Sequence, residues 1–86
     1  MNIEILNKVN NQIYTCYKLY GAYASSHEAM GVLFEEIDEL FDEVKQKELN
    51  LQRVEEEIID CITVLVKMHQ DVVEGKCDSF RRKCNK

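Results

Sequence analysis

The sequence contains no proline and only three glycines, at positions 21, 31 and 75. Because proline and glycine are the residues that most often interrupt regular structure, their scarcity allows long continuous helices. No segment alternates strictly between apolar and polar residues, as a half-buried strand would. These absences predict an all-α fold.

Long apolar runs and basic clusters that could form a binding face are also missing. No run of eighteen apolar residues is present to span a membrane, and the amino terminus lacks the basic and then apolar pattern of a signal peptide. We therefore expect a cytoplasmic protein without a membrane partner. The net charge of −5 argues against a nucleic-acid polymer as partner, because binding a phosphate backbone requires a basic face.

The four cysteines show no Cys-x-x-Cys spacing, and nothing in the sequence indicates secretion. Disulfides and a zinc site are therefore not expected. Cys16 and Cys61 fall on apolar helical positions, where we expect them to act as small buried hydrophobic residues. Cys77 and Cys84 lie near the carboxyl terminus, and a role for them in metal binding or cross-linking stays open.

Apolar residues recur at spacings of three and four along most of the chain, which predicts helices near residues 3–24, 26–48 and 51–74. The polar segment between the last two helices predicts a reversal, so that they form an antiparallel hairpin. We expect one helical domain over residues 1–75. Residues 76–86 are basic and predict a tail or a short helix.

Capping residues support these boundaries. Ser25 and Glu28 have the spacing of a capping box, in which each side chain accepts a hydrogen bond from backbone near the other. Asn50 is a suitable cap for the helix that follows it. Gly75 is a suitable left-handed terminator for the same helix.

The apolar positions predict which helix faces are buried. The expected buried stripe of the second helix consists of Met30, Leu33, Ile37, Leu40 and Val44. The expected face of the third helix is broader and consists of Val54, Ile58, Ile62, Leu65, Val66, His69 and Val73. Three helices with this much apolar surface cannot all be sealed within 86 residues. We therefore expect a homodimer or homotetramer in which hairpins from different chains complete a four-helix core.

Two pairs of acidic residues lie beside these buried stripes. Glu36 and Glu39 share one face of the second helix, and Glu57 and Asp60 share one face of the third. Both pairs are placed symmetrically about residue 48, so the predicted hairpin brings them level. Four carboxylates at one level repel one another unless a cation lies between them, and Mg²⁺ prefers oxygen ligands of this kind. The alternative is an ordinary solvated face, as for the outward-facing Glu35, Asp38 and Asp42.

The segments 26–40 and 56–60 resemble the all-α nucleoside triphosphate pyrophosphohydrolases, the MazG-like superfamily. The resemblance rests on Glu-x-x-Glu at residues 36–39 and Glu-x-x-Asp at residues 57–60, with 17 residues between the pairs. It implies that these four acids bind Mg²⁺, with Mn²⁺ as a substitute. It also implies hydrolysis of a nucleotide between its α- and β-phosphates, with Glu36 or Glu39 positioning the attacking water.

The resemblance does not extend to the residues that select the nucleotide. Tyr23, His27 and Lys67 are candidates for substrate binding, although core packing, capping and solvation are ordinary roles for these residue types. The third helix carries no obvious further polar ligand after Asp60. A non-catalytic helical interaction module, a metal-binding structural dimer and a degenerate relative of the family therefore remain alternatives.

Overall fold

The computed structural model describes residues 3–75, and all regular secondary structure in that range is helical. The elements are α1 (Ile3–Tyr20), α2 (Ser26–Val44), α3 (Leu51–Met68) and a π-helical turn, η1 (His69–Val73), that continues α3. No strand occurs among these residues. The all-α prediction is therefore confirmed for the described part of the chain.

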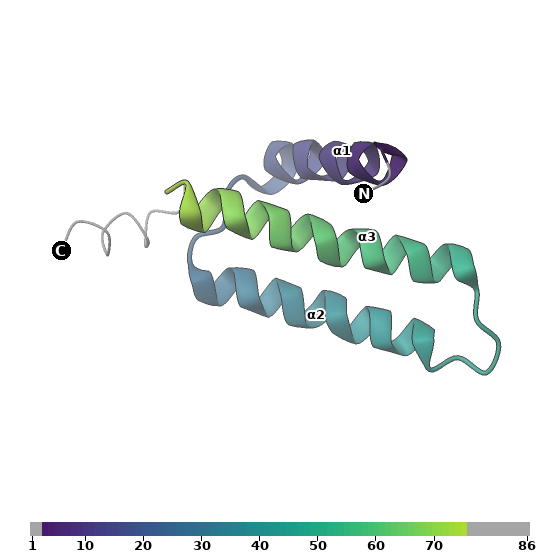
Figure 1. Cartoon of the computed structure of the whole chain (residues 1–86). Coiled ribbons are helices and arrows are strands. Elements are labelled where there is room, and N and C mark those ends of the chain that lie inside the picture. The colour runs from purple at the N-terminus through teal and green to yellow at the C-terminus, as the bar shows by residue number, and fades with distance from the viewer. Residues whose placement is uncertain (1–2, 76–86) are drawn as a thin grey trace.

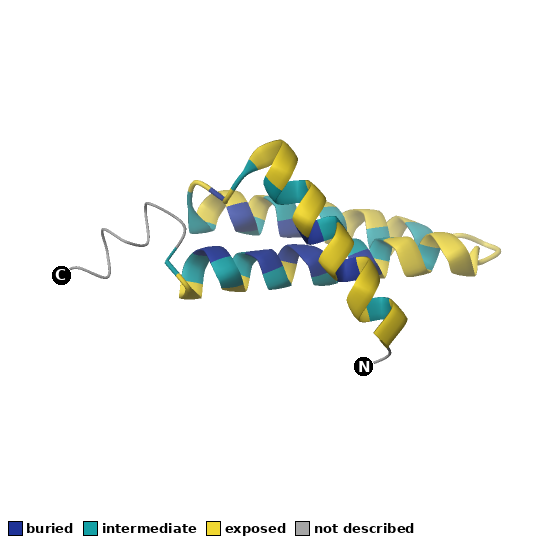
Figure 2. Ribbon diagram, turned by 90° about the horizontal axis from the view of Figure 1, so that it is seen from above, coloured by how far each residue is buried: buried dark blue, intermediate teal, exposed yellow. Residues whose placement is uncertain are grey.

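The three helices form a hairpin with one helix laid on it. α2 and α3 run antiparallel and pack along their lengths, and α1 packs on α3 (Figure 1). Seen from above, α1 crosses the hairpin at an angle (Figure 2). The predicted antiparallel hairpin is therefore present, with its reversal in the segment 45–50.

The predicted caps hold the start of each hairpin helix. Ser25 Oγ accepts a hydrogen bond of 3.1 Å from the backbone N–H of Glu28. Glu28 Oε1 accepts one of 3.1 Å from the N–H of Ala24, one residue before the position that an ideal capping box would use. Asn50 Oδ1 accepts a hydrogen bond of 3.2 Å from the N–H of Arg53 at the start of α3.

Two helices end earlier than the sequence predicted. α1 ends at Tyr20 instead of residue 24, because Gly21 adopts a φ of 71° and leaves the right-handed helical region. α2 ends at Val44 instead of residue 48, since the residues after it are polar and gain nothing from helical burial. Gly75 has a φ of 75°, which confirms it as the terminator beyond η1.

The buried residues form two clusters. One joins the α1–α2 connection, α2 and α3 through Tyr23, Ala29, Leu33 and Val64. The other joins α1 and α3 through Val9, Ile13 and Ile59. Both clusters lie between the helices, where Figure 2 shows the darkest ribbon.

The predicted buried faces were wrong at several positions in the single chain. Ile37 and Val44 of α2 are 44% and 51% exposed. Ile58, Leu65, His69 and Val73 are exposed too, whereas α3 buries Ile59, Thr63, Val64 and Lys67. The physical reason is that α1 covers the side of α3 that carries Ile59, Ile62 and Val66. The side that carries Ile58 and Leu65 stays exposed.

Seven of the exposed apolar residues of α2 and α3 make up what we call the open apolar face. At about 100° per residue, the four acids lie on one flank of the α2–α3 contact, and these apolar residues lie on the other flank of both helices. The face consists of Phe34, Ile37, Phe41 and Val44 of α2 and Leu51, Ile58 and Leu65 of α3. α1 packs on α3 around Ile59, and the residues of the face stay exposed.

The remaining sequence predictions concern the cysteines, the tail and the membrane. Cys16 and Cys61 are free thiols that are half-buried instead of fully buried. Residues 76–86, including Cys77 and Cys84, lie outside the described residues, so the predicted tail is not described. Across residues 3–75, no helix is both long enough and apolar enough to cross a membrane.

Candidate metal centre

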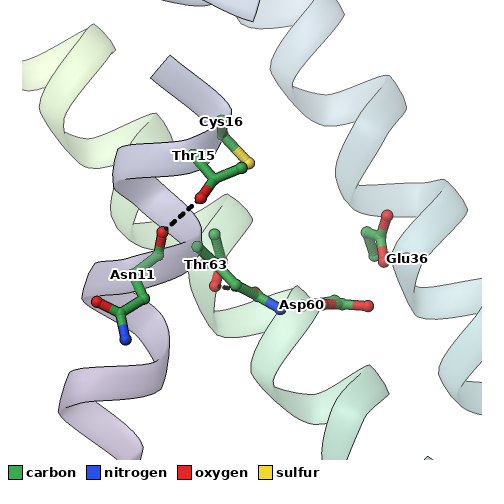
Figure 3. Close-up of a pocket in the computed structure, with 7 residues that line it drawn as sticks. Asn11, Thr15, Cys16, Glu36, Asp60 and Thr63 are labelled. Atoms are coloured by element: carbon green, nitrogen blue, oxygen red, sulfur yellow. Dashed lines mark hydrogen bonds between the residues drawn. The ribbon is translucent and has the colours of Figure 1, made fainter. Parts of the chain in front are cut away.

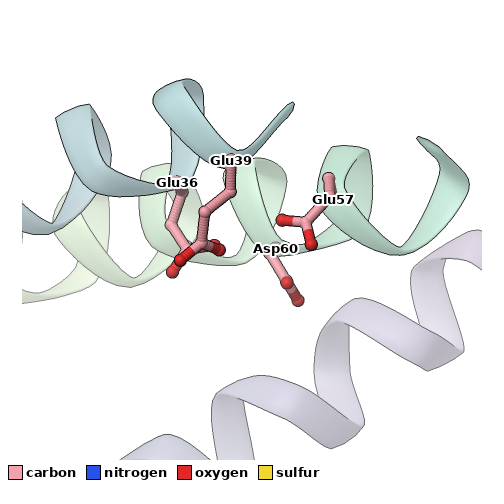
Figure 4. Close-up of side chains that lie close together, drawn as sticks. All are labelled: Glu36, Glu39, Glu57 and Asp60. Carbon is pink, nitrogen blue, oxygen red and sulfur yellow. The ribbon is translucent and has the colours of Figure 1, made fainter. Parts of the chain in front are cut away.

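Four carboxylates meet where α2 and α3 face each other. Glu36 and Glu39 come from α2, and Glu57 and Asp60 come from α3 (Figure 4). One oxygen of each residue lies within 4.8 Å of the corresponding oxygens of the other three. The symmetry of the two pairs about the turn therefore predicted their meeting correctly.

Each pair is held at the edge of the core. Glu36, Glu57 and Asp60 are half-buried, and Glu39 is exposed. Buried Leu33 precedes the first pair on α2, and buried Ile59 lies between the members of the second pair on α3. The packing of the hairpin therefore fixes the carboxylates, while solvent reaches the cluster from the side of Glu39.

The cluster is electrostatically strained without a cation. Burial raises the pKa of Glu36 to about 7, helped by the negative charges of Glu39, Asp60 and Glu57. Burial and the charge of Asp60 also raise the pKa of Glu57. Glu36 Oε2 and Glu57 Oε2 are buried, and neither accepts a hydrogen bond. A buried acceptor without a donor is costly, and a cation bound between the pairs would satisfy both oxygens.

This strain predicts how the stability of the metal-free protein depends on pH. The pKa of Glu36 rises from 4.5 to about 7 in the folded chain, so the folded state binds the proton more tightly than the unfolded state. The free energy of unfolding should therefore fall as the pH rises from about 4.5 to about 7. Urea unfolding in a metal chelator measures it, and Glu36→Gln should flatten the dependence. A wild-type free energy that instead rises across this window would contradict the prediction.

A side chain of α1 also reaches the cluster. Gln12 Nε2 donates a hydrogen bond of 2.9 Å to Asp60 Oδ1, and Gln12 Oε1 accepts one of 2.7 Å from Thr63 Oγ1. Sequence reasoning missed this contact. Nothing local to Gln12 signals it, because the partner lies 48 residues away and the contact depends on how α1 docks.

A shallow hollow of about 380 Å³ lies between α1 and the acids. Figure 3 shows Glu36 and Asp60 on its far side from Thr15 and Cys16. Its lining residues are Asn11, Gln12, Thr15, Cys16, Glu36, Asp60 and Thr63. Two of the four clustered acids therefore border a space that is otherwise lined by uncharged side chains.

A larger cavity of about 780 Å³ lies between the α1–α2 connection and the hairpin. Glu36 lines this cavity as well as the hollow, so the two spaces meet at the acidic cluster. Its walls are formed largely by aromatic and aliphatic side chains, including Tyr20, Tyr23 and Val64. The charged residues that line it are Glu28, Glu35, Glu36 and Lys67.

The structure separates the three candidate substrate residues. Tyr23 and Lys67 line the larger cavity, but His27 is exposed and lines neither that cavity nor the hollow. Lys67 is itself only 3% exposed, and its Nζ lies 3.6 Å from the centre of the Tyr23 ring. Its ammonium group is therefore already held by protein groups.

The main partner of Lys67 is Asp71, which is fully buried in η1. Lys67 Nζ lies 3.2 Å from Asp71 Oδ2, and the same oxygen accepts a 2.8 Å hydrogen bond from the N–H of Tyr23. The hydroxyl of Tyr17 donates to Asp71 Oδ1. We call these four residues the Asp71 network. Sequence reasoning missed it, although the spacing of four between Lys67 and Asp71 on a largely apolar helix was an available signal.

Comparison with known proteins adds no assignment to this geometry. No family model matches the chain, and none of the curated proteins or solved structures compared with it is significantly similar. The site must therefore be interpreted from its own residues.

Proposed function

We propose that the protein is a Mg²⁺-dependent nucleotide pyrophosphohydrolase, which cleaves a nucleoside triphosphate between the α- and β-phosphates. The observation that carries the proposal is the meeting of Glu36, Glu39, Glu57 and Asp60, with two buried oxygens that accept no hydrogen bond. The resemblance of the two acidic pairs to the MazG-like superfamily supports the same reaction.

The residues fit a hard divalent cation. All donors are carboxylate oxygens, which suit Mg²⁺ and also Mn²⁺, and no sulfur or imidazole is among them. Glu36, Glu39, Glu57 and Asp60 would hold the ion. Bound Mg²⁺ would supply charge neutralisation for the phosphates and would acidify water.

The chain's own side chains would orient the reactants. Glu39 is the exposed member of the cluster, so its carboxylate can accept a hydrogen bond from an incoming water. Glu36 borders both the hollow and the larger cavity, so its carboxylate lies where a phosphate chain and the rest of a nucleotide would join. In this proposal, Glu36 or Glu39 aligns the water with the phosphorus atom that it attacks.

The charges that line the larger cavity favour binding of the nucleotide's base there over binding of its phosphates. Glu28 and Glu35 would repel phosphate, and the one lysine in the lining, Lys67, is already paired with Asp71. Aromatic walls suit a planar, uncharged group. We therefore place the base beside Tyr23 and the phosphates at the four acids.

The direct test is a screen of canonical and modified nucleoside triphosphates with Mg²⁺, in which pyrophosphate and the monophosphate are measured. We expect stoichiometric release of both products from at least one nucleotide, and none in the presence of a chelator. Release of inorganic phosphate instead, or no product from any nucleotide, would contradict the proposal.

The open apolar face favours a second function, a helical module that binds another protein or acts as a structural dimer. Large exposed apolar surfaces mark interaction sites. The nucleotide screen separates this function from the first, because an interaction module would release no pyrophosphate.

We further propose that two copies of the chain associate through the open apolar face and complete a four-helix core. Sedimentation should show a dimer or tetramer at micromolar concentration. Phe41→Glu should shift it toward monomer, because a charge buried in such an interface is costly. Tyr14→Glu is the matched control, since Tyr14 is 70% exposed and belongs to α1, which contributes no residue to this face. A compact wild-type monomer would contradict the proposal.

A further inference from the structure

The acid that α1 contacts differs from its neighbours in how it is held. Asp60 Oδ1 accepts the hydrogen bond of 2.9 Å from Gln12, while Glu36 Oε2 and Glu57 Oε2 have no donor. Gln12 is half-buried, so its amide is partly shielded from solvent. One oxygen of Asp60 is thus engaged by an amide of the protein, and its other oxygen is left for a different partner.

The orientation of that amide is set by a second hydrogen bond. Thr63 is only 4% exposed and donates its hydroxyl proton to Gln12 Oε1 at 2.7 Å. Because the carbonyl oxygen of the amide faces Thr63, the NH₂ group faces Asp60. Thr63 and Asp60 are three residues apart on α3 and lie on the same face, so Gln12 bridges two side chains of one helix.

We propose that Gln12 is a positioning residue for the metal centre, and that Thr63 acts through it. This inference rests on the proposed function, since it concerns the affinity of the acidic cluster for Mg²⁺. Gln12 engages Oδ1 and so fixes the rotation of the Asp60 carboxylate, which would leave Oδ2 as the oxygen that binds the ion. Hydrogen-bonded partners of metal ligands typically change metal affinity by about 10- to 100-fold when they are lost.

The measurement is the dissociation constant for Mg²⁺, obtained by titration calorimetry on the folded full-length chain at constant pH without nucleotide. Gln12→Leu removes the donor and keeps the side chain's approximate size, and it should raise the dissociation constant about tenfold. Asn11→Leu is the matched control, because Asn11 is the exposed neighbour of Gln12 and borders the same hollow. The control should leave the constant unchanged.

The role of Thr63 is tested by a double-mutant cycle. Thr63→Val keeps the shape of the side chain and removes the hydroxyl, so the Gln12 amide is no longer fixed. This variant should weaken Mg²⁺ binding by less than Gln12→Leu does. The double variant should bind no more weakly than Gln12→Leu alone, because Thr63 acts only through Gln12. Additive losses of Mg²⁺ affinity would contradict the action of Thr63 through Gln12.

The outcomes distinguish positioning from a packing role. If Gln12 only held α1 in place, Gln12→Leu would lower the melting temperature and leave the Mg²⁺ dissociation constant unchanged, which would overturn the inference. If the wild type binds no Mg²⁺, the proposed function fails and the inference fails with it. If the wild type binds Mg²⁺ but releases no pyrophosphate, the hydrolase proposal fails while the calorimetry still decides the role of Gln12.

Discussion

Replacing Glu39 by alanine is expected to reduce pyrophosphate release by more than about 100-fold. Loss of a residue that only supports a metal ligand typically costs about 10- to 100-fold, and Glu39 is itself a proposed ligand. Glu39 is the exposed member of the cluster, and its charge is the second cause, after burial, of the raised pKa of Glu36. The same substitution should therefore stabilise the metal-free chain, because it relieves repulsion among the carboxylates. Hydrolysis assays and urea unfolding in chelator measure the two effects.

Asp38→Ala is the control for this prediction, since Asp38 is the preceding residue of α2 and is also exposed. It removes the same charge from a position outside the cluster. Hydrolysis should stay close to the wild-type rate, and the metal-free chain should not be stabilised to the same extent. Equal effects of Glu39→Ala and Asp38→Ala would mean that overall charge, not the cluster, determines the behaviour.

Asp71→Ala is expected to have the largest effect on stability, a loss of about 3–5 kcal/mol in the free energy of unfolding. Asp71 is fully buried, and the substitution leaves the Lys67 ammonium and the N–H of Tyr23 without their acceptor. Small domains are stable by only about 5–15 kcal/mol, so the substitution should remove a large part of the free energy of unfolding. Circular dichroism during urea titration measures the loss.

Two further variants sharpen this prediction. Lys67→Met should cost less than Asp71→Ala, because Asp71 would keep its hydrogen bonds from Tyr17 and Tyr23. Asp42→Ala should cost about 1 kcal/mol at most, since its pair with Lys45 at 3.3 Å is exposed to solvent. An Asp71→Ala loss no larger than that of Asp42→Ala would contradict the assigned role of the network.

The features that the sequence predicted correctly depend on residues close together in the chain or on the regular spacing of residues along one helix. Ser25 and Asn50 bond backbone groups three residues later, so the sequence alone identifies them as caps. The acidic pairs follow the same logic, because the spacing within each pair and the single turn between helices determine where they meet. The meeting of Glu36 with Asp60 needed only one assumption, the reversal near residue 48.

The features that sequence missed depend on how α1 docks. Gln12 and Tyr17 contact residues 48 and 54 positions away, and no periodicity carries that information. The same docking decides which arc of α3 is buried. Burial of Ile59 and exposure of Leu65 could not be separated by counting apolar residues, because both lie on apolar arcs of the helix.

The placement of the acids at equal distances from the turn limits how the spacer between the two motifs can change length. Residues inserted between Val44 and Leu51 would extend the loop and leave the height of each pair unchanged. A longer α2 would require an equally longer α3 to keep the hairpin closed. One added turn of about 3.6 residues in each of the two helices lengthens the spacer by about seven residues. Spacer length should therefore vary freely in the loop and only in discrete steps in the helices.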